Sequence, residues 1–347
     1  MNVPASEFLI YGVAISLTSS NPQFKDFVEG TLHNYVNRDQ EQSNFNIHIA
    51  IQFDEKADIK KSKFRIGNGI YFDNEHQKIA FNHKLFTGEF SKRGNDALDI
   101  KGEVLNPFPN TIKQTAKGMF IKNYSYSEML FHQLYRELIL MPVFWILRNK
   151  FGKYLMHASA ISIGNESLVF LGNDGVGKTT IALQLLQQKD TLFFGDNFLL
   201  YDAERIYSFV DTLRVNKKDC DSFLDENKQS KYKKVFEGKS RVHFNYHKDY
   251  IAENSIPTSF YVLMQGEENE KRRISEDEFI NFTFGINNFV KEFDKFSYAA
   301  TLIYLFVASK NIVEEELNAL KRLVQKDACF LLQVNKNFKE YADLLIK

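Results

Sequence analysis

The sequence predicts an α/β protein in two parts. A strand-rich α+β N-terminal domain is expected over residues 1–126, and a domain with a mixed sheet around a phosphate-binding loop over residues 127–347. Three observations lead to this prediction. Short apolar segments typical of strands dominate the first part. A β-hairpin pattern, which does not occur in an all-parallel sheet, begins near residue 158. A glycine-rich loop then separates an apolar run from a segment with helical periodicity.

Composition limits the classes of partner. With 44% hydrophobic and 25% charged residues, the 347-residue chain is typical of globular proteins and long enough for two domains. Lys plus Arg equal Asp plus Glu at 44 each, so no overall field attracts nucleic acid or a membrane, and we expect neither as a partner. The N-terminus lacks a signal-peptide pattern, the apolar run 138–147 is too short to cross a bilayer, and the only cysteines are Cys220 and Cys329. These features favour a cytoplasmic location.

The N-terminal part reads as strands joined by turns. Strands are expected at residues 8–15, 45–51, 69–72 and 78–81. No cluster of His, Cys, Asp or Glu stands out among them, so we interpret this part as a structural or partner-binding module. From residue 127, apolar residues recur at helical spacing toward residue 151, which predicts a long helix leading into the second domain.

The second domain is expected to begin its sheet with a hairpin. Residues 158–163 and 168–171 are apolar and are separated only by residues 164–167. Later elements are a helix at 180–186, one strand over 191–201, a turn into a strand at 206–209, a buried strand at 259–264 and a helix with a capping box at 275–278. The polar segment 217–239 is predicted to be a solvated helical insert, with a flexible lid over substrate as the alternative.

The glycine-rich loop matches GxxxxGK[ST], the spacing with which a loop wraps the phosphates of a nucleotide. The predicted nucleotide-binding residues are Gly172, Asn173, Asp174, Gly175, Val176, Gly177, Lys178, Thr179 and Thr180. Glycines allow backbone N–H groups to turn toward an anion, the lysine reaches the β and γ oxygens, and the Thr179 hydroxyl can bind Mg²⁺. The strand before the loop and the helix after it place the phosphates at a helix N-terminus. A chance match in a glycine-containing turn is the alternative.

Together these residues resemble the HPr kinase/phosphorylase family and the wider HPr-kinase-like group, which shares its P-loop fold with phosphoenolpyruvate carboxykinase. His157, in His-Ala-Ser-Ala, precedes the first loop glycine by 15 positions (157 to 172), like the active-site histidine of the family. Asp196 follows Thr179 by 17 positions (179 to 196), like the family's acidic residue. The resemblance covers residues 130–300 and implies an HPr-kinase-like P-loop domain.

The resemblance also implies roles for individual residues. Lys178 would hold the phosphates of ATP, Thr179 would bind Mg²⁺, Asp196 would take the proton from an acceptor hydroxyl, and His157 would line the pocket, unless it is a structural histidine at a strand end. The family has two adjacent aspartates, whereas Gly195 stands in the first position here. For the family's downstream metal-binding Glu, Asp211 is the nearest acidic substitute.

Two further residues have open interpretations. Asp174 occupies a loop position that is often Ser, and its carboxylate either points away from the phosphates or binds metal. Arg241 either clamps the transferring phosphoryl group or is an ordinary exposed strand residue.

The leading hypothesis is therefore an ATP-dependent, Mg²⁺-requiring kinase that phosphorylates a serine-like hydroxyl of a protein, a peptide or a small molecule. The region that would dock HPr is not recognisable. A nucleotide-binding switch or assembly protein with little kinase activity is the alternative, for which the missing acidic residue would be the signature. An enzyme of the phosphoenolpyruvate carboxykinase type would need additional metal ligands. The resemblance further implies a homo-oligomer.

Overall fold

The computed structural model of the chain describes residues 4–35, 43–53, 64–67, 70–73, 77–83, 85–104, 126–217, 220, 231–287, 311–324, 328–334 and 345. Two compact units divide the chain. The first comprises Met1–Leu147, Thr212–Asn245 and Phe293–Ala308, and the second Arg148–Asp211, Tyr246–Glu292 and Ser309–Lys347. This division differs from the single boundary expected after residue 126, because residues 127–147 and a later segment group with the N-terminal part. Among the described residues, no helix has both the length and the apolar character to cross a membrane.

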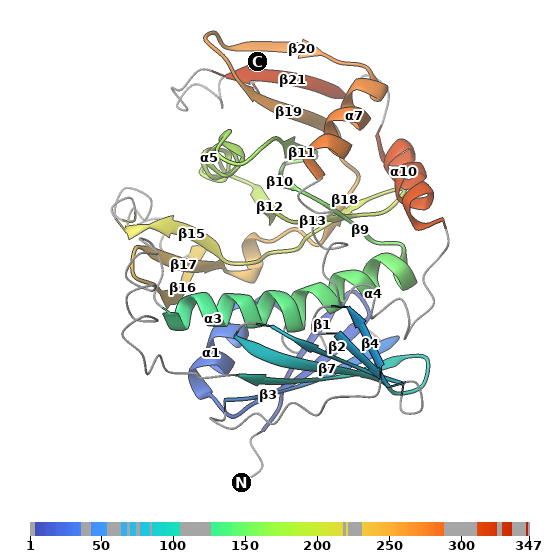
Figure 1. Cartoon of the computed structure of the whole chain (residues 1–347). Coiled ribbons are helices and arrows are strands. Elements are labelled where there is room, and N and C mark those ends of the chain that lie inside the picture. Colours follow the sequence, from blue (N-terminus) through green and yellow to red (C-terminus); the bar gives the residue numbers. More distant parts are fainter. Residues whose placement is uncertain are drawn as a thin grey trace. The chain divides into compact units, whose positions relative to one another are not determined.

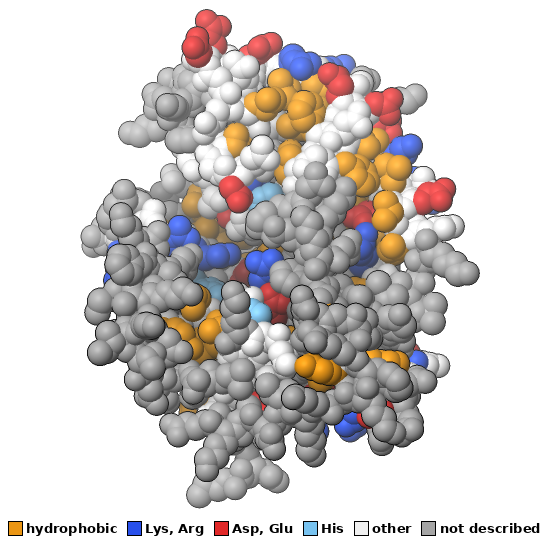
Figure 2. All heavy atoms as spheres, viewed as in Figure 1, with side chains coloured by type: hydrophobic (Ala, Val, Ile, Leu, Met, Phe, Trp, Pro, Cys, Tyr) orange, Lys and Arg blue, Asp and Glu red, His pale blue; other side chains and the backbone are white. Residues whose placement is uncertain are grey.

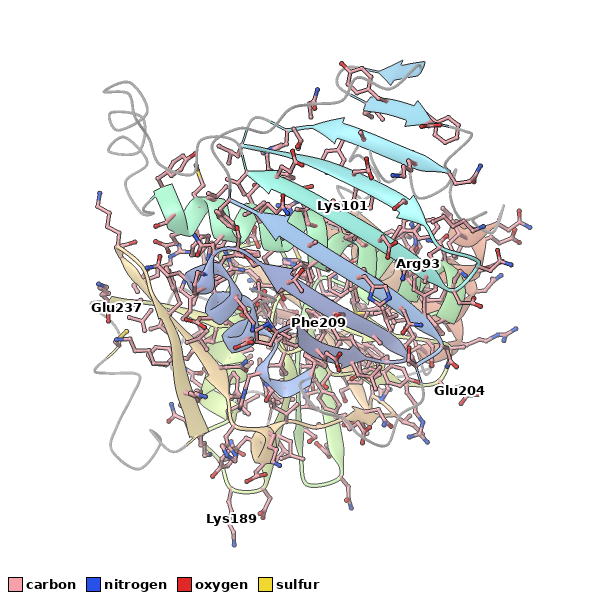
Figure 3. All side chains as sticks on the ribbon, turned by 90° about the horizontal axis from the view of Figure 1, so that it is seen from below. Arg93, Lys101, Lys189, Glu204, Phe209 and Glu237 are labelled. Atoms are coloured by element: carbon pink, nitrogen blue, oxygen red, sulfur yellow. The ribbon has the colours of Figure 1, made fainter. Side chains whose placement is uncertain are left out.

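An eight-stranded mixed sheet is the framework of the first unit (Figure 1), in the order β1-β2-β3-β8-β7-β6-β5-β4. Its strands are β1 (Ser6–Ile10), β2 (Val13–Ser19), β3 (Phe45–Gln52), β4 (Phe64–Gly67), β5 (Ile70–Asp73), β6 (Lys78–Asn82), β7 (Phe86–Lys92) and β8 (Ala97–Val104). The pairs β2·β3 and β3·β8 are parallel, and the remaining pairs are antiparallel. The strands expected near residues 45, 70 and 78 are thus present. Along β8, buried Ile100 and Gly102 alternate with exposed Lys101 (Figure 3).

The single strand expected over residues 8–15 is wrong. A two-residue turn at Tyr11 (φ 47°) and Gly12 (φ 87°) splits it into the antiparallel pair β1·β2. A turn with two positive φ angles gives the twist that a tight hairpin needs. Tyr11 carries no turn signal in sequence, because the left-handed conformation is uncommon for an aromatic residue.

Two helical segments pack on this sheet. Helix α1 (Pro22–Thr31) begins at Asn21, whose side chain accepts the Phe24 N–H at 3.0 Å, and is followed by a short 3₁₀ turn, η1 (His33–Tyr35). The long helix predicted from residue 127 is present as α3 (Tyr126–Tyr135), a π-helical segment η2 (Arg136–Leu140) and α4 (Met141–Phe151). The π segment ends two residues before Pro142, which has no N–H to donate to the preceding turn.

A three-stranded sheet completes the first unit and corrects another prediction. It consists of β15 (Leu213–Asn216), β17 (Arg241–Tyr246) and β16 (Tyr232–Glu237). Part of the segment 217–239, predicted as a helical insert or lid, is therefore strand, while residues 218–219 and 221–230 lie outside the described part of the chain. Gly30 of α1 lies so close to β16 that a Cβ there would be 2.2 Å from Val235 Cγ1.

Two neighbouring histidines of the first unit, buried His243 and half-buried His132, lie in an environment that lowers their pKa values. The ring centroids of His132, on α3, and His243, on β17, are 5.0 Å apart. Burial, and then neighbouring cationic groups, lowers the pKa of His132 to about 3 and that of His243 to about 4. Both imidazoles are consequently neutral at pH 7 in the folded protein.

Acid should therefore destabilise the first unit. In the unfolded chain both histidines bind protons near the ordinary histidine pKa of 6.5, whereas in the folded chain they remain neutral down to about pH 4. The unfolded state then holds more protons, so the free energy of unfolding falls as the pH drops from 6.5 toward 4, by up to about 1.4 kcal/mol per pH unit for each histidine.

Urea unfolding in the presence of a chelator, followed by the fluorescence of the single tryptophan, Trp145 in α4, measures this effect. His243→Gln should take up about one proton fewer on unfolding than wild type, so the slope of the free energy of unfolding against pH should be smaller. Substitution of the exposed His48 should leave it unchanged. An identical slope for wild type and His243→Gln would contradict the prediction.

The second unit is built on a six-stranded mixed sheet in the order β12-β10-β11-β19-β21-β20. Its strands are β10 (Ala158–Ile163), β11 (Glu166–Leu171), β12 (Thr191–Gly195), β19 (Ser259–Gln265), β20 (Glu270–Arg273) and β21 (Cys329–Val334). The pairs β11·β19 and β19·β21 are parallel, whereas β10·β11, β10·β12 and β20·β21 are antiparallel. The mixed sheet and the 158–171 hairpin are thereby confirmed.

The remaining elements of the second unit include a small four-stranded sheet and three helices. The sheet consists of β18 (Asn254–Ser255), β14 (Ile206–Tyr207), β13 (Leu199–Tyr201) and β9 (Tyr154–Met156), and a 3₁₀ turn, η5 (Lys248–Tyr250), precedes β18. Helix α5 (Lys178–Leu185) follows the glycine loop, and α7 (Glu276–Ile286) and α10 (Ile312–Leu323) come later. The capping box expected at Ser275 is present. Phe260 and Phe279, 5.0 Å apart, join β19 to α7 in the core.

Charged side chains of both signs are interspersed on the face drawn in Figure 2. This agrees with the equal totals of basic and acidic residues in the sequence.

Candidate functional site

The glycine-rich loop has the predicted strand-loop-helix setting. Strand β11 ends at Leu171, the loop follows, and α5 begins at Lys178. Gly175 (φ 80°) and Gly177 (φ 102°) adopt left-handed conformations that other residues rarely take. The N-terminus of α5 therefore presents its first backbone N–H groups at the end of a loop shaped by glycine, which suits an anion.

The loop lysine is held by its own loop. Lys178 is 5% exposed, and its Nζ donates to the carbonyl oxygens of Gly172 at 2.8 Å and Asn173 at 3.2 Å. Burial lowers the pKa of the ammonium group, while the carboxylates of Asp174 and Asp196 oppose that shift. A bound phosphate would replace the two carbonyl oxygens as the hydrogen-bond acceptor of Lys178. A charged acceptor binds an ammonium group more strongly than a neutral carbonyl oxygen does.

Asp196 connects the loop to the sheet. It lies in a bend directly after β12, and not within a strand as the sequence suggested. Its Oδ2 accepts the Thr179 hydroxyl at 2.7 Å, and its Oδ1 accepts the hydroxyl of buried Ser159 on β10. The structure thus brings together the loop hydroxyl and the acidic residue that sequence reasoning had singled out separately.

Ser159 was missed as a site residue, although the sequence held a signal for it. It stands two positions after His157, and residues two apart on an extended segment point to the same face. Its hydroxyl fixes the carboxylate of Asp196 from the side opposite Thr179, so it orients that group.

The bend at Asp196 depends on its two neighbours. The expected single strand over 191–201 is wrong, because the chain leaves the large sheet after Gly195 and joins the small sheet at Leu199. A Cβ at Gly195 would lie 2.6 Å from the Phe209 carbonyl oxygen and 2.7 Å from that of Phe198. Asn197 has a φ of 71°, a left-handed conformation that asparagine tolerates better than most residues. Residue 195 thus has no room for a side chain.

His157 faces the glycine loop and is 3% exposed. Its Nδ1 lies 2.9 Å from the carbonyl oxygen of Asn197, which can only accept, so Nδ1 carries the proton. Its Nε2 lies 3.3 Å from Asp174 Oδ1. Burial and then the charge of Lys178 lower the pKa of His157, against the opposing effect of Asp174. In the neutral form Nε2 and the carboxylate are both acceptors, so a proton shared between them, or a donor group beside the pair, would satisfy both.

Asp174 lies at the edge of the glycine loop. Its side chain is 73% exposed and its Oδ1 lies 3.3 Å from His157 Nε2. Whether the carboxylate points away from bound phosphates or binds metal stays a prediction.

Two residues outside the motif support the site and were not predicted. Asn287, directly after α7, accepts the His157 backbone N–H through its Oδ1 at 3.0 Å, and Gln265, the last residue of β19, donates to the Gly175 carbonyl at 3.2 Å. Both lie far from the loop in sequence, so only the tertiary fold reveals them.

The remaining predicted residues have different outcomes. Val176 is buried in the loop, and Thr180 is half-buried in the first turn of α5. Asp211 is half-buried in the segment that follows β14 in sequence, and its role as a metal ligand stays a prediction. Arg241 begins β17 in the first unit, and its role as a phosphoryl clamp also stays a prediction.

Comparisons with known proteins add no relative: no protein-family model matches the sequence, and a search of the curated proteins finds no match.

Proposed function

We propose that this chain is an ATP-dependent, Mg²⁺-requiring phosphotransferase of the HPr-kinase-like type, which transfers the γ-phosphoryl group to a serine-like hydroxyl of a protein, a peptide or a small molecule. The observation that carries the proposal is the 2.7 Å hydrogen bond between Thr179 Oγ1 and Asp196 Oδ2. It unites the hydroxyl that binds Mg²⁺ in P-loop proteins with a carboxylate, beside a lysine already inside the loop.

The chemistry required of the protein is modest. Phosphoryl transfer depends mainly on positioning the acceptor in line and on neutralising charge on the phosphate oxygens. Lys178 and the N-terminus of α5 would hold the phosphates. Thr179 would hold Mg²⁺, which would neutralise part of the negative charge on the phosphate oxygens. Asp196 would receive the proton of the acceptor hydroxyl, and Ser159 would keep its carboxylate in orientation.

His157 and Asp174 would form the edge of the same site. A substrate hydroxyl beside this pair could donate to Nε2 or to Oδ1, which would give the acceptor substrate a defined place. This arrangement would position a hydroxyl without needing a base other than Asp196.

One observation favours the alternative, a nucleotide-binding switch with little or no kinase activity. Both carboxylate oxygens of Asp196 already accept hydrogen bonds, and Gly195 supplies no second acidic group. An aspartate held in this way could serve Mg²⁺ and nucleotide binding without abstracting a proton.

Transfer of label from ATP carrying a labelled γ-phosphate tests the proposal. The full chain is incubated with Mg²⁺ and either a desalted cytosolic extract or free serine, with chelator-treated samples and Lys178→Ala as controls. We expect label on an acceptor only with wild type and Mg²⁺. Saturable nucleotide binding without any transfer would reject the kinase and favour the switch.

A further inference from the structure

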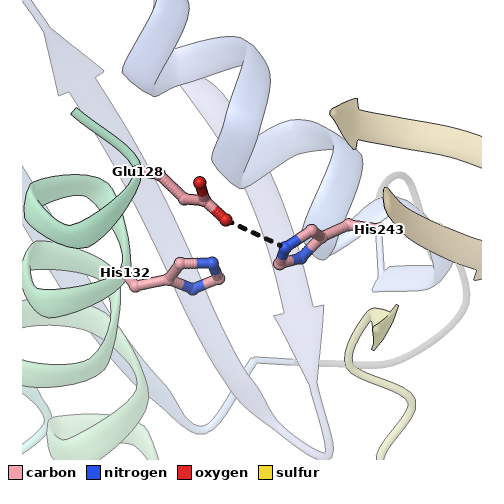
Figure 4. Close-up of side chains that lie close together, drawn as sticks. All are labelled: Glu128, His132 and His243. Carbon is pink, nitrogen blue, oxygen red and sulfur yellow. Dashed lines mark ion pairs between the residues drawn. The ribbon is translucent and has the colours of Figure 1, made fainter. Parts of the chain in front are cut away.

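A second group of potential ligands lies in the first unit, away from the glycine loop in sequence. Glu128 and His132 are four residues apart on α3, which places them on one face of the helix, and His243 comes from β17 (Figure 4). One ligand atom from each of the three residues lies within 4.8 Å of the others. Glu128 Oε1 and His243 Nε2 are 3.7 Å apart. Ligands of one tetrahedral Zn²⁺ lie about 3.3 Å apart for bonds of ~2.0–2.1 Å, so small side-chain movements would close the site.

Two of the three side chains are removed from water, and His132 is half-buried. Glu128 and His243 are both 0% exposed. Within the described part of the chain, His243 Nε2 has no hydrogen-bond partner, although it is buried and turned toward Glu128. A buried polar nitrogen without a partner is costly, and an ion at the centre of the cluster would remove that cost.

Hydrogen bonds from neighbouring groups orient His243 and Glu128, as is usual for the ligands of protein-bound metals. The Thr212 hydroxyl lies 3.3 Å from His243 Nδ1, so the proton of this ring can reside on Nδ1 and leave the Nε2 lone pair toward the cluster. The Lys239 N–H donates to Glu128 Oε2 at 3.2 Å. A Cβ at Gly238 would lie 2.2 Å from Glu128 Oε1, so glycine lets the backbone approach the carboxylate closely.

Aromatic rings fix the two imidazoles. Phe27 packs edge-on against His132 at 5.0 Å, and Phe236 packs edge-on against His243 at 5.6 Å. Such packing restricts the rotation of both rings, which preorganises them for one ligand geometry.

Charged side chains near the cluster both oppose and favour the binding of a cation. Arg214 affects both histidines and Arg241 affects His243, and these cations oppose a further positive ion. The carboxylate of Glu128 offsets one unit of charge, and the two imidazoles are neutral. A set of two imidazole nitrogens and one carboxylate oxygen suits Zn²⁺ and similar transition metals, whereas Mg²⁺ and Ca²⁺ prefer oxygen ligands alone.

We infer that Glu128, His132 and His243 form a binding site for a transition-metal dication of the Zn²⁺ type, with three protein ligands. This site is independent of the proposed kinase function, because it uses neither the glycine loop nor Asp196. Three protein ligands leave one tetrahedral position for water or another small ligand.

Metal titration of the tag-free full chain tests the inference. After removal of metal with a chelator, Co²⁺ is added as a spectroscopic probe and Zn²⁺ is quantified by elemental analysis after dialysis. We expect one equivalent of Zn²⁺ per chain, visible absorption bands of four-coordinate Co²⁺ that Zn²⁺ abolishes, and no displacement by excess Mg²⁺. Zn²⁺ should also raise the Tm by about 5 °C or more at 100 times its Kd.

Matched variants make the outcome specific. Glu128→Gln keeps the size of the side chain and an acceptor for the Lys239 N–H, and we expect it to bind Zn²⁺ at least about 10-fold more weakly. His243→Ala should lose the Co²⁺ bands, whereas substitution of the exposed His48 should not. Asp196→Asn should retain them, which separates this site from the nucleotide site. Absence of bound Zn²⁺ in wild type, or equal binding by wild type, Glu128→Gln and His243→Ala, would overturn the inference.

Discussion

We expect Asp196→Asn to lower the rate of γ-phosphoryl transfer by about 10²–10⁴-fold, while nucleotide affinity stays within several-fold of wild type. Asparagine has nearly the same shape and can still accept the Thr179 hydroxyl, so the bend and the loop should persist. It cannot accept a proton from the acceptor, and it brings no negative charge to Mg²⁺. The loss should therefore appear in kcat, with little change in binding.

Measurement of kcat and of nucleotide Kd for both proteins separates the two effects. Asp190→Asn is a matched control, because Asp190 is exposed just before β12 and has a φ of 58°, which asparagine accepts. This control removes one charge from the same region and should behave as wild type. Transfer by Asp196→Asn at the wild-type rate would exclude Asp196 as the base.

We expect Gly195→Asp, which inserts the second acidic residue that the proposed HPr-kinase-like resemblance would predict, to destabilise the second unit by about 3–5 kcal/mol and not to improve catalysis. The added Cβ would lie 2.6 Å and 2.7 Å from two backbone carbonyl oxygens, neither of which is on a flexible side chain. A carboxylate at this buried position would in addition face those oxygens without a donor. Gly195→Ala adds only the Cβ, so it should lose most of the stability that the clash with the two carbonyl oxygens costs.

Thermal unfolding of the two Gly195 variants, beside Gly285→Ala, checks this expectation. Gly285 lies in α7, and a Cβ there would meet nothing within 4 Å. Replacing a helical glycine by alanine should raise stability by up to about 1 kcal/mol. If Gly195→Asp were as stable as wild type, the bend would be adaptable, and the single acidic residue would need another explanation.

Features formed within a short segment could be predicted from the sequence alone. The strand, glycine loop and helix over residues 166–185 were predictable because spacing and glycine chemistry are local. The 158–171 hairpin, the helix from 126 to 151 and the Ser275 capping box follow from the same kind of local pattern. Local prediction was wrong where an aromatic residue takes a left-handed conformation in a turn, as Tyr11 does before Gly12, or where one apolar run serves two sheets, as after Gly195.

What only the tertiary structure decided is which distant groups meet. Ser159, Thr179 and Asp196 come from three separate segments, and their hydrogen bonds depend on β10 and β12 pairing beside α5. The spacing of Glu128 and His132 is visible in sequence, but their partner His243 stands 111 positions after His132 (132 to 243). Sequence determines the chemistry that each segment carries, because propensity and spacing act over a few residues. The site itself depends on sheet pairing and packing, which join segments far apart in the chain.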